Sequence, residues 1–272
     1  MPLECPVRGC GEPLAWEAKR CVCPNGHVFD VARSGYVNLL SPGDKRSRSP
    51  GDSKETVLAR GRLLERGFGA HLLEALSTMV ASRVAVTGTV ALDVGCGDGY
   101  HLSALADRFA LTGYGADLST AAIAAAARRT TAIRWIAANA DRRLPFSDDA
   151  FDWILSITSR KNASDLGRLL APTGRLLVAV PGCDDLAELR AAVLGRADAR
   201  DRVSRTEEIF AGRFVLEERA EARTTFRADA LALGDLLATT YRGARRSAAA
   251  RIAALGDMDI TISADVMCFR RA

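Results

Sequence analysis

The segment Asp93–Gly99 carries the residue types best suited to bind a small molecule, because it places glycines at alternate positions directly after an apolar run. Glycine lacks a Cβ atom, so such a loop lets a ligand approach the backbone closely. A helical pattern follows over residues 100–109, and a second apolar run over 111–116 ends in Asp117. Strand, glycine loop, helix, strand and carboxylate in this order predict half of a nucleoside-binding unit.

The spacing from Gly95 to Asp117 is shared by NAD sites and S-adenosylmethionine sites, where the carboxylate binds the ribose hydroxyls. Asp98 favours S-adenosylmethionine, because a carboxylate is poorly placed against a pyrophosphate but tolerable near a sulfonium-bearing amino acid. A third apolar run, residues 134–139, ends in a polar residue and is followed by Leu144-Pro145-Phe146. This arrangement resembles the class I methyltransferase pattern, in which the polar residue at the end of the third strand faces the adenine.

The predicted cofactor is therefore S-adenosylmethionine. The residues predicted to bind it are Asp93, Gly95, Cys96, Gly97, Asp98, Asp117, Leu118, Asn139, Ala140 and Asp141. Asp117 could also cap the helix that follows it. Cys96 is better explained as a small side chain that fills the loop than as a nucleophile. No side chain stands out as an obligatory general base, so the sequence leaves the catalytic residue unknown.

Cysteines crowd the amino-terminal end of the chain, where four of the seven fall within the first 23 residues. Cys5 and Cys10 form a C-x4-C pair, and Cys23 and His27 form a C-x3-H pair. Zinc takes four tetrahedral nitrogen or sulfur ligands, which these two pairs supply. We expect a structural zinc site, since four protein ligands leave no open position; Cys21 is then the spare cysteine. Unligated thiols in a small loop region are the alternative.

Composition bounds the class of protein. The chain has 272 residues, 48% of them hydrophobic, and a net charge of +4 that by itself does not indicate nucleic-acid binding. No apolar run approaches the ~20 residues of a membrane span, and no secretory signal is visible. We expect a cytoplasmic location, where a disulfide framework is disfavoured.

The order of the predicted strands and helices indicates one α/β domain with a small amino-terminal appendage. We predict a small module over 1–40, a basic linker over 41–54 and a methyltransferase domain over 55–272. The expected fold is a Rossmann-like class I methyltransferase with a seven-stranded, mostly parallel sheet whose last strand is antiparallel. Further helices are predicted over 55–66, 71–83, 120–129, 163–170, 185–194 and within 228–255, and further strands over 148–155, 174–181, 214–224 and 258–271.

Several motifs together resemble the bacterial 23S rRNA guanine-N1 methyltransferases, a family that includes macrolide-resistance members. They are Cys23–Asp30, Gly35–Leu40, Lys45–Ser53, Asp93–Gly97 and Leu144–Asp148. The resemblance implies an amino-terminal zinc ribbon that helps to hold RNA, and methyl transfer to N1 of a guanine in a 23S rRNA hairpin. It also implies a homodimer, since members of the family are typically dimers.

Three segments depart from the family pattern. The first cysteine pair is C-x4-C where the family has C-x2-C, and the family's aromatic-Ala-Pro loop is Ser156–Asn162 here. The family's Met-x-Pro and Trp segment is 238–244 here. Candidate substrate contacts are Lys45, Arg46, Arg48, Arg160 and Asn162, with a solvated linker and loop as the alternative.

The two altered substrate-side segments leave another function open. It is a methyltransferase of the same fold redirected to a small metabolite or peptide. A non-catalytic RNA-binding protein is a third hypothesis. The intact Asp93, Gly95, Gly97 and Asp117 argue against it.

Overall fold

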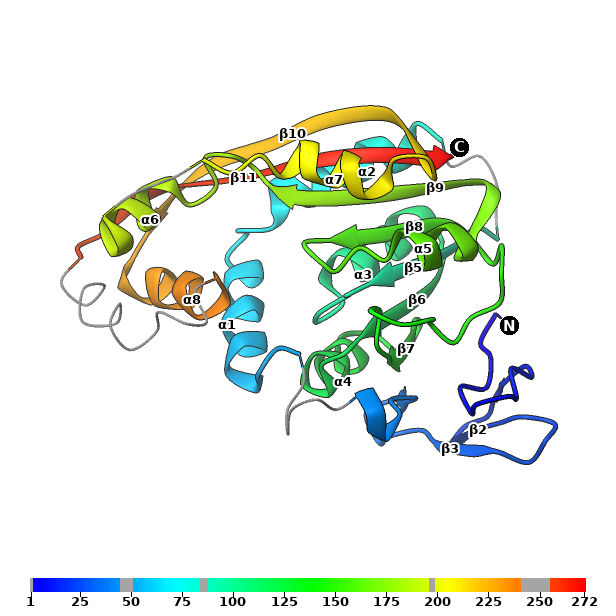
Figure 1. Ribbon diagram of the computed structural model, residues 1–272. Helices are drawn as coiled ribbons and strands as arrows, with labels where there is room; N and C mark the ends of the chain where they lie inside the picture. Colours follow the sequence, from blue (N-terminus) through cyan, green and yellow to red (C-terminus); the bar gives the residue numbers. More distant parts are fainter. Residues whose placement is uncertain (1, 45–50, 84–87, 196–198, 241–254) are drawn as a thin grey trace.

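The computed structural model describes residues 2–44, 51–83, 88–195, 199–240 and 255–272 (Figure 1). Among these residues the main sheet has eight strands in the order β10-β11-β9-β8-β5-β6-β7-β4. The strands are β4 (Tyr36–Asn38), β5 (Val90–Val94), β6 (Thr112–Asp117), β7 (Arg134–Ala137), β8 (Phe151–Ile157), β9 (Leu170–Pro181), β10 (Phe214–Ala228) and β11 (Met258–Arg271).

The Rossmann-like fold class is confirmed, but the predicted number of seven strands is wrong. β4 to β9 pair in parallel, and β11 runs antiparallel to both β9 and β10, as predicted for the last strand. The eighth strand is β4, which comes from the amino-terminal module and extends the sheet beside β7. Its three residues have no local pattern that distinguishes this pairing from one inside the module.

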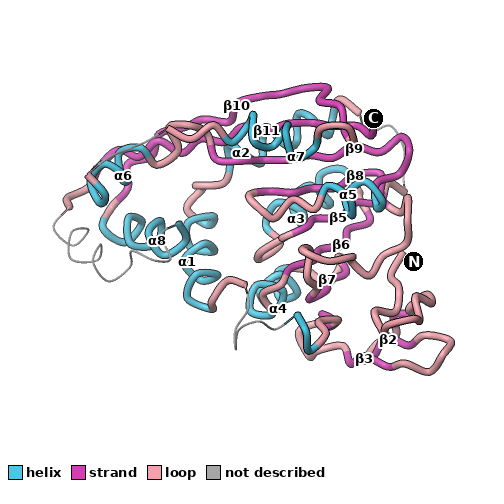
Figure 2. The backbone as a smooth tube through the Cα atoms, in the orientation of Figure 1, coloured by secondary structure: helices cyan, strands magenta, loops and turns pink. Residues whose placement is uncertain are grey.

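Eight α-helices are found in the described ranges (Figures 1 and 2). They are α1 (Lys54–Glu65), α2 (Ala70–Ala81), α3 (Tyr100–Phe109), α4 (Thr120–Arg129), α5 (Ala163–Leu169), α6 (Ala187–Leu194), α7 (Arg202–Phe210) and α8 (Ala230–Thr240). Within the described ranges, every helix is too short or too polar to cross a lipid bilayer.

Alternating side chains of the strands build two cores. In β5, Leu92 and Val94 enter one core with α5 and α7, while Ala91 enters the other with α2, α3 and α4. This alternation follows from the two-residue period of a strand. A third, smaller core joins α1, α6 and α8, which places these helices beside the sheet at one end of the molecule (Figure 1).

The amino-terminal module packs against the larger domain. It contains a small sheet of β1 (Ala15–Trp16), β2 (Arg20–Val22) and β3 (Val28–Asp30). The Leu3 side chain is fully buried in the first core. The backbone N–H of Glu4 donates to the carbonyl oxygen of Pro145 at 2.9 Å. The predicted boundaries at 40 and 54 stay a prediction; β4, at the end of the predicted module, already belongs to the main sheet.

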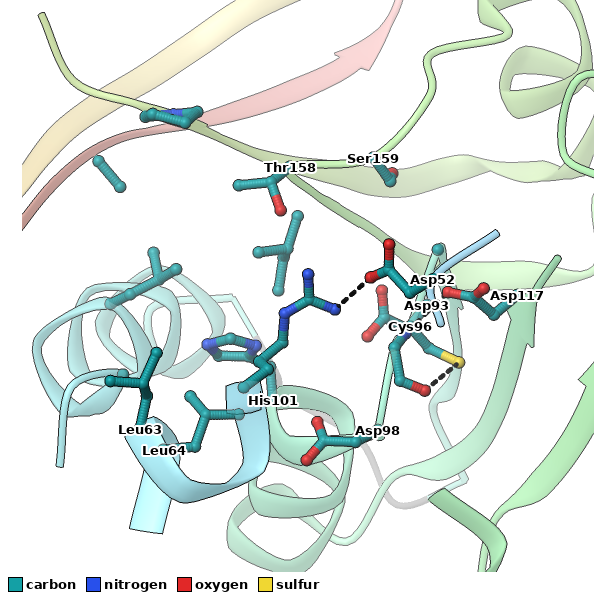
Figure 3. A pocket seen from close by; sticks show the side chains of 18 of the residues that line it. Asp52, Leu63, Leu64, Asp93, Cys96, Asp98, His101, Asp117, Thr158 and Ser159 are labelled. Carbon is teal, nitrogen blue, oxygen red and sulfur yellow. Dashed lines mark hydrogen bonds and ion pairs between the residues drawn. The ribbon is translucent and has the colours of Figure 1, made fainter. Parts of the chain in front are cut away.

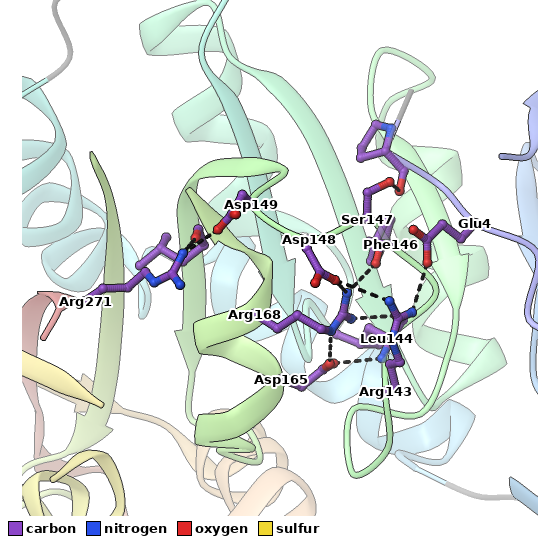
Figure 4. Close-up of polar contacts among 12 residues, drawn as sticks. Glu4, Arg143, Leu144, Phe146, Ser147, Asp148, Asp149, Asp165, Arg168 and Arg271 are labelled. Carbon is purple, nitrogen blue, oxygen red and sulfur yellow. Dashed lines mark hydrogen bonds and ion pairs between the residues drawn. The ribbon is translucent and has the colours of Figure 1, made fainter. Parts of the chain in front are cut away.

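Arg168 of α5 holds the turn that receives this module (Figure 4). Its guanidinium donates to the carbonyl oxygens of Leu144 and Phe146 at 3.0 and 2.6 Å. It also pairs with the carboxylates of Asp165 and Asp148, each at 2.8 Å. The Leu-Pro-Phe turn therefore has a structural role, in which it fixes the surface where the amino-terminal segment docks.

Candidate functional site

A cavity of about 650 Å³ lies at the carboxyl ends of the parallel strands (Figure 3). Such a volume is typical of ligand pockets, which fall in the range of roughly 300–1,000 Å³. All the residues predicted to bind the cofactor line it: Asp93, Gly95, Cys96, Gly97, Asp98, Asp117, Leu118, Asn139, Ala140 and Asp141. They come together because parallel strands present their carboxyl ends at one edge of the sheet. Their roles in binding remain predictions.

The glycine loop takes a conformation that favours glycine at each of its three positions. The φ angles of Gly95, Gly97 and Gly99 are 77°, 57° and 76°. A Cβ atom at Gly95 would overlap the side chain of Ser159, and one at Gly99 would overlap the ring of Trp135. Of the three, Gly95 and Gly97 line the cavity and present backbone atoms to it without a side chain.

Asp117 binds the loop and its own helix through backbone amides. The N–H of Gly97 donates to Oδ2 at 3.0 Å, and the N–H of Ser119 donates to Oδ1 at 2.7 Å. Burial raises the pKa of Asp117, although these hydrogen bonds lower it. The cap of α4 is Ser119, whose hydroxyl accepts the N–H of Ala122, so Asp117 is not needed in that role.

Asp93 is a buried carboxylate of the pocket with an oxygen that lacks a partner among the described residues. It is 2% exposed, and its Oδ1 has no hydrogen-bond partner in the described part of the chain. Burial, together with the charges of Asp117 and Asp98, raises its pKa to about 8. A cationic amino group would satisfy this oxygen, whereas a pyrophosphate would be repelled by the three carboxylates. The pocket therefore fits S-adenosylmethionine better than a dinucleotide.

The segment before α1 forms part of the pocket wall, which sequence reasoning missed. The hydroxyl of Ser119 donates to the carbonyl oxygen of Asp52 at 2.7 Å, and Asp52 pairs with Arg60 at 2.7 Å. A Cβ atom at Gly51 would lie 2.7 Å from the backbone nitrogen of Ser119. The motif Lys45–Ser53 drew attention to this segment, but no local sequence pattern indicated that it contacts Ser119.

The other end of the linker is fixed as well. Asn139 donates to the carboxylate of Asp44 at 3.1 Å, and Arg142 pairs with the same carboxylate at 2.9 Å. Both ends of the predicted linker thus contact loops of the pocket. Lys45, Arg46 and Arg48, predicted as substrate contacts, lie outside the described residues.

The loop after β8 lies on the pocket, as expected for a substrate-side loop. Ile157, Thr158, Ser159 and Arg160 line the cavity. Arg160 is 82% exposed and lies 3.9 Å from Asp141. Asn162, by contrast, caps α5 by accepting the N–H of Asp165, which gives it a structural role. Of the other altered segment, residues 241–244 lie outside the described ranges.

Another part of the cavity lining is more apolar, and none of it was predicted from the sequence. Its lining includes Leu63, Leu64, Phe68, Leu72, Leu236 and Ile262. His71 and His101 also face it, each with one buried ring nitrogen that lacks a partner among the described residues. Burial lowers both pKa values, that of His101 to about 4, so these imidazoles are neutral at physiological pH.

Four side chains of the amino-terminal module form a compact ligand set. The ligand atoms of Cys5, Cys10, Cys23 and His27 all lie within 4.8 Å of one another. The Sγ atoms of Cys5 and Cys23 are 3.5 and 3.3 Å from Nδ1 of His27. Tetrahedral ligands of zinc are about 3.5–3.8 Å apart, given Zn–S and Zn–N bonds of ~2.3 and ~2.0 Å. The geometry therefore fits the predicted structural zinc, while Cys21 is buried in the first core.

Comparison with known proteins agrees with an amino-terminal zinc-binding module followed by a methyltransferase domain. Residues 3–48 match the family described as "RlmA, N-terminal", a zinc ribbon, and residues 91–178 match "Methyltransferase domain". A 23S rRNA (guanine(748)-N(1))-methyltransferase of Streptomyces fradiae is 37% identical over 240 residues, which cover 87% of this chain and 83% of that protein. YxjB of Bacillus subtilis (strain 168) is 38% identical over 65% of this chain and 63% of its own length.

Solved structures share the fold of the larger domain. The YcgJ protein from Bacillus subtilis has a TM-score of 0.51 and 14% identity, over 73% of this chain and 99% of its own. At this identity the likeness concerns the fold alone.

Proposed function

Because the chain belongs to the family of 23S rRNA guanine-N1 methyltransferases, we propose that it transfers a methyl group from S-adenosylmethionine to N1 of a guanine in 23S rRNA. One structural relationship carries the proposal. The sheet whose carboxyl edge bears the cofactor-sized pocket continues through β4 into the module with the Cys₃His cluster. The main sheet thus connects a pocket suited to a cationic nucleoside with the module that carries the ligand set.

Within the pocket we assign roles by charge and position. Asp117 would bind the ribose hydroxyls, the free oxygen of Asp93 would accept from the ammonium group, and Asn139 to Asp141 would face the adenine. S-adenosylmethionine supplies an activated methyl carbon when bound. The protein's own residues therefore need mainly to orient the acceptor nitrogen in line with it. Cys5, Cys10, Cys23 and His27 would hold a structural zinc.

RNA is the proposed partner, held through phosphate contacts by the basic residues of the linker and by Arg160. A cytoplasmic location follows from that partner. The homodimer that the family resemblance implies, and any macrolide resistance, stay predictions.

The test uses the full chain, S-adenosylmethionine and an in vitro transcript of 23S rRNA. Digestion and mass spectrometry of the nucleosides should show 1-methylguanosine, and Asp117→Ala should abolish it together with cofactor binding measured by calorimetry. 23S rRNA from a strain that lacks the gene serves as a second substrate. If the protein binds the cofactor but methylates neither RNA, a small metabolite or peptide is favoured as the acceptor instead.

A further inference from the structure

The two ends of the pocket differ in the strands that form them. The predicted adenine loop follows β7, whereas Pro181 and Asp185 follow β9, and Ser263 lies on β11. β9 is two strands from β5 in the sheet, which corresponds to about 10 Å at ~4.8 Å per strand. Asp185 therefore lies beyond the glycine loop on the side away from the adenine, where an acceptor would have to approach the methyl group.

Two adjacent carboxylates after β9 have different surroundings. The hydroxyl of Ser263 donates to Asp184 at 2.5 Å, and Arg223 pairs with Asp184 at 2.9 Å. Asp185 receives only the backbone N–H of Ser263, on Oδ1 at 3.1 Å, and its Oδ2 has no partner among the described residues. Asp184 thus has a structural role. Asp185 lines the cavity, and one of its carboxylate oxygens makes no hydrogen bond to a described residue.

The pKa values of the two carboxylates agree with this contrast. The hydrogen bond from Ser263 and the charge of Arg223 hold the pKa of Asp184 below its usual range. Burial raises the pKa of Asp185 to about 6, and the charge of Asp184 adds to this, while Arg202 and Arg190 lower it. Neighbouring carboxylates whose environments separate their pKa values are typical of acid–base sites.

Four other titratable side chains of the pocket suit the same role less well. Asp93 is buried at the glycine loop, and Asp52 is paired with Arg60. His101, with its pKa of about 4, is a weaker base than Asp185. Asp141 lies on the adenine-side loop.

We propose that Asp185 is a catalytic residue whose free carboxylate oxygen binds the N1–H of the acceptor guanine and takes its proton during methyl transfer. The proposal rests on the function proposed above. As the proton moves to Asp185, the electron pair of the N1–H bond forms the new bond to the methyl carbon. The carbon–sulfur pair returns to sulfur, which leaves a neutral thioether, and Asp185 later releases its proton to water. Adenine carries no proton on N1, so the same carboxylate also selects guanine.

The test is the single-turnover rate of 1-methylguanosine formation on a 23S rRNA transcript between about pH 6 and pH 9. Asp185→Asn should slow transfer by about 100-fold or more at neutral pH. The rate of the Asp185→Asn variant should rise with pH. The difference from the parent rate should shrink toward pH 9, since guanine N1 then ionises in solution. Asp185→Glu, which keeps the carboxylate, should recover part of the rate. Cofactor affinity by calorimetry should change less than twofold in both variants.

Asp259→Asn is the matched control, because Asp259 lies on β11 like Ser263, is 66% exposed and pairs only with Arg227 among the described residues. Its rate should equal that of the parent. A parent-like rate and pH profile in Asp185→Asn, or a loss of cofactor affinity equal to the loss of rate, overturns the role of Asp185. If the parent itself methylates no guanine of the transcript, the proposed function fails instead.

Discussion

The hydroxyl of Ser119 donates a hydrogen bond of 2.7 Å to the backbone carbonyl oxygen of Asp52. Ser119 caps α4, and Asp52 stands one residue before the cap of α1. The contact therefore ties the end of the linker to the loop that follows Asp117, the last residue of β6, which lines the pocket. Turn-forming composition predicts a solvated linker, yet this end of it is built into the cofactor site.

Gly51→Ala should weaken binding of S-adenosylmethionine by about tenfold, or ~1.4 kcal/mol. Gly51 has a φ of +80°, and the added Cβ would lie 2.7 Å from the backbone nitrogen of Ser119, so the pocket wall must shift. Calorimetric titration measures the effect. Gly212→Ala is the control, since its φ is +73° but no atom lies within 4 Å. Equal cofactor affinities in the two variants would show that the contact between this segment and Ser119 does not contribute to cofactor binding.

The pKa of Asp93, about 8, should make the stability of the ligand-free protein depend on pH. This folded-state pKa lies above the ordinary value of ~3.9. The folded protein therefore binds more protons than the unfolded chain between ~4 and ~8, and the free energy of unfolding falls as pH rises through that window. Asp93→Asn should flatten this slope and be more stable than the parent at pH 8. Denaturant titrations at about pH 5 and pH 8 measure both; equal slopes would refute the assignment.

Cofactor binding should expel the same proton. Placing an ammonium group beside Asp93 favours the ionised carboxylate, so affinity for S-adenosylmethionine should rise with pH up to about 8. Calorimetry at pH 7 in two buffers with different ionisation enthalpies should show release of about one proton per cofactor. Asp93→Asn should bind more weakly and release none. Proton release by the variant equal to that of the parent would point to another group.

Elements with a strong local pattern could be predicted from the sequence. The predicted ranges 100–109, 120–129 and 258–271 coincide with α3, α4 and β11. The first two begin after a glycine loop or a serine cap and keep a helical period. The residues predicted for the cofactor pocket meet for a topological reason, since successive parallel strands end at one edge of a sheet.

Contacts between distant segments could not be predicted, because no local pattern specifies a partner. β4 has three residues and pairs with β7, almost a hundred positions further on. Ser119 and Asp52 are 67 residues apart, and Asp185 depends on Ser263, 78 residues away. α7 (Arg202–Phe210) was also missed: its charged composition hides the three buried positions Val203, Thr206 and Phe210.

Loss of a zinc ligand should remove the metal and destabilise the whole chain. Cys23→Ala should reduce the content from one zinc per chain to nearly none, and lower the melting temperature by several degrees, since metal affinity contributes to folding. Metal analysis and thermal unfolding measure this. Cys21→Ala is the control, because Cys21 is fully buried but outside the ligand set, and it should retain its zinc. Zinc retention by Cys23→Ala would remove this residue from the site.

The basic linker should contribute to RNA affinity through charge alone. Replacing Lys45, Arg46 and Arg48 together by alanine should reduce the salt dependence of binding to a 23S rRNA transcript. If each side chain contacts one phosphate, the slope of log K against log [salt] falls by about 2–3. Calorimetry should show unchanged affinity for S-adenosylmethionine, since a charge that contacts only RNA phosphates does not touch the cofactor. Filter binding at several salt concentrations measures the slope, and a parent-like slope would assign these residues to a merely solvated linker.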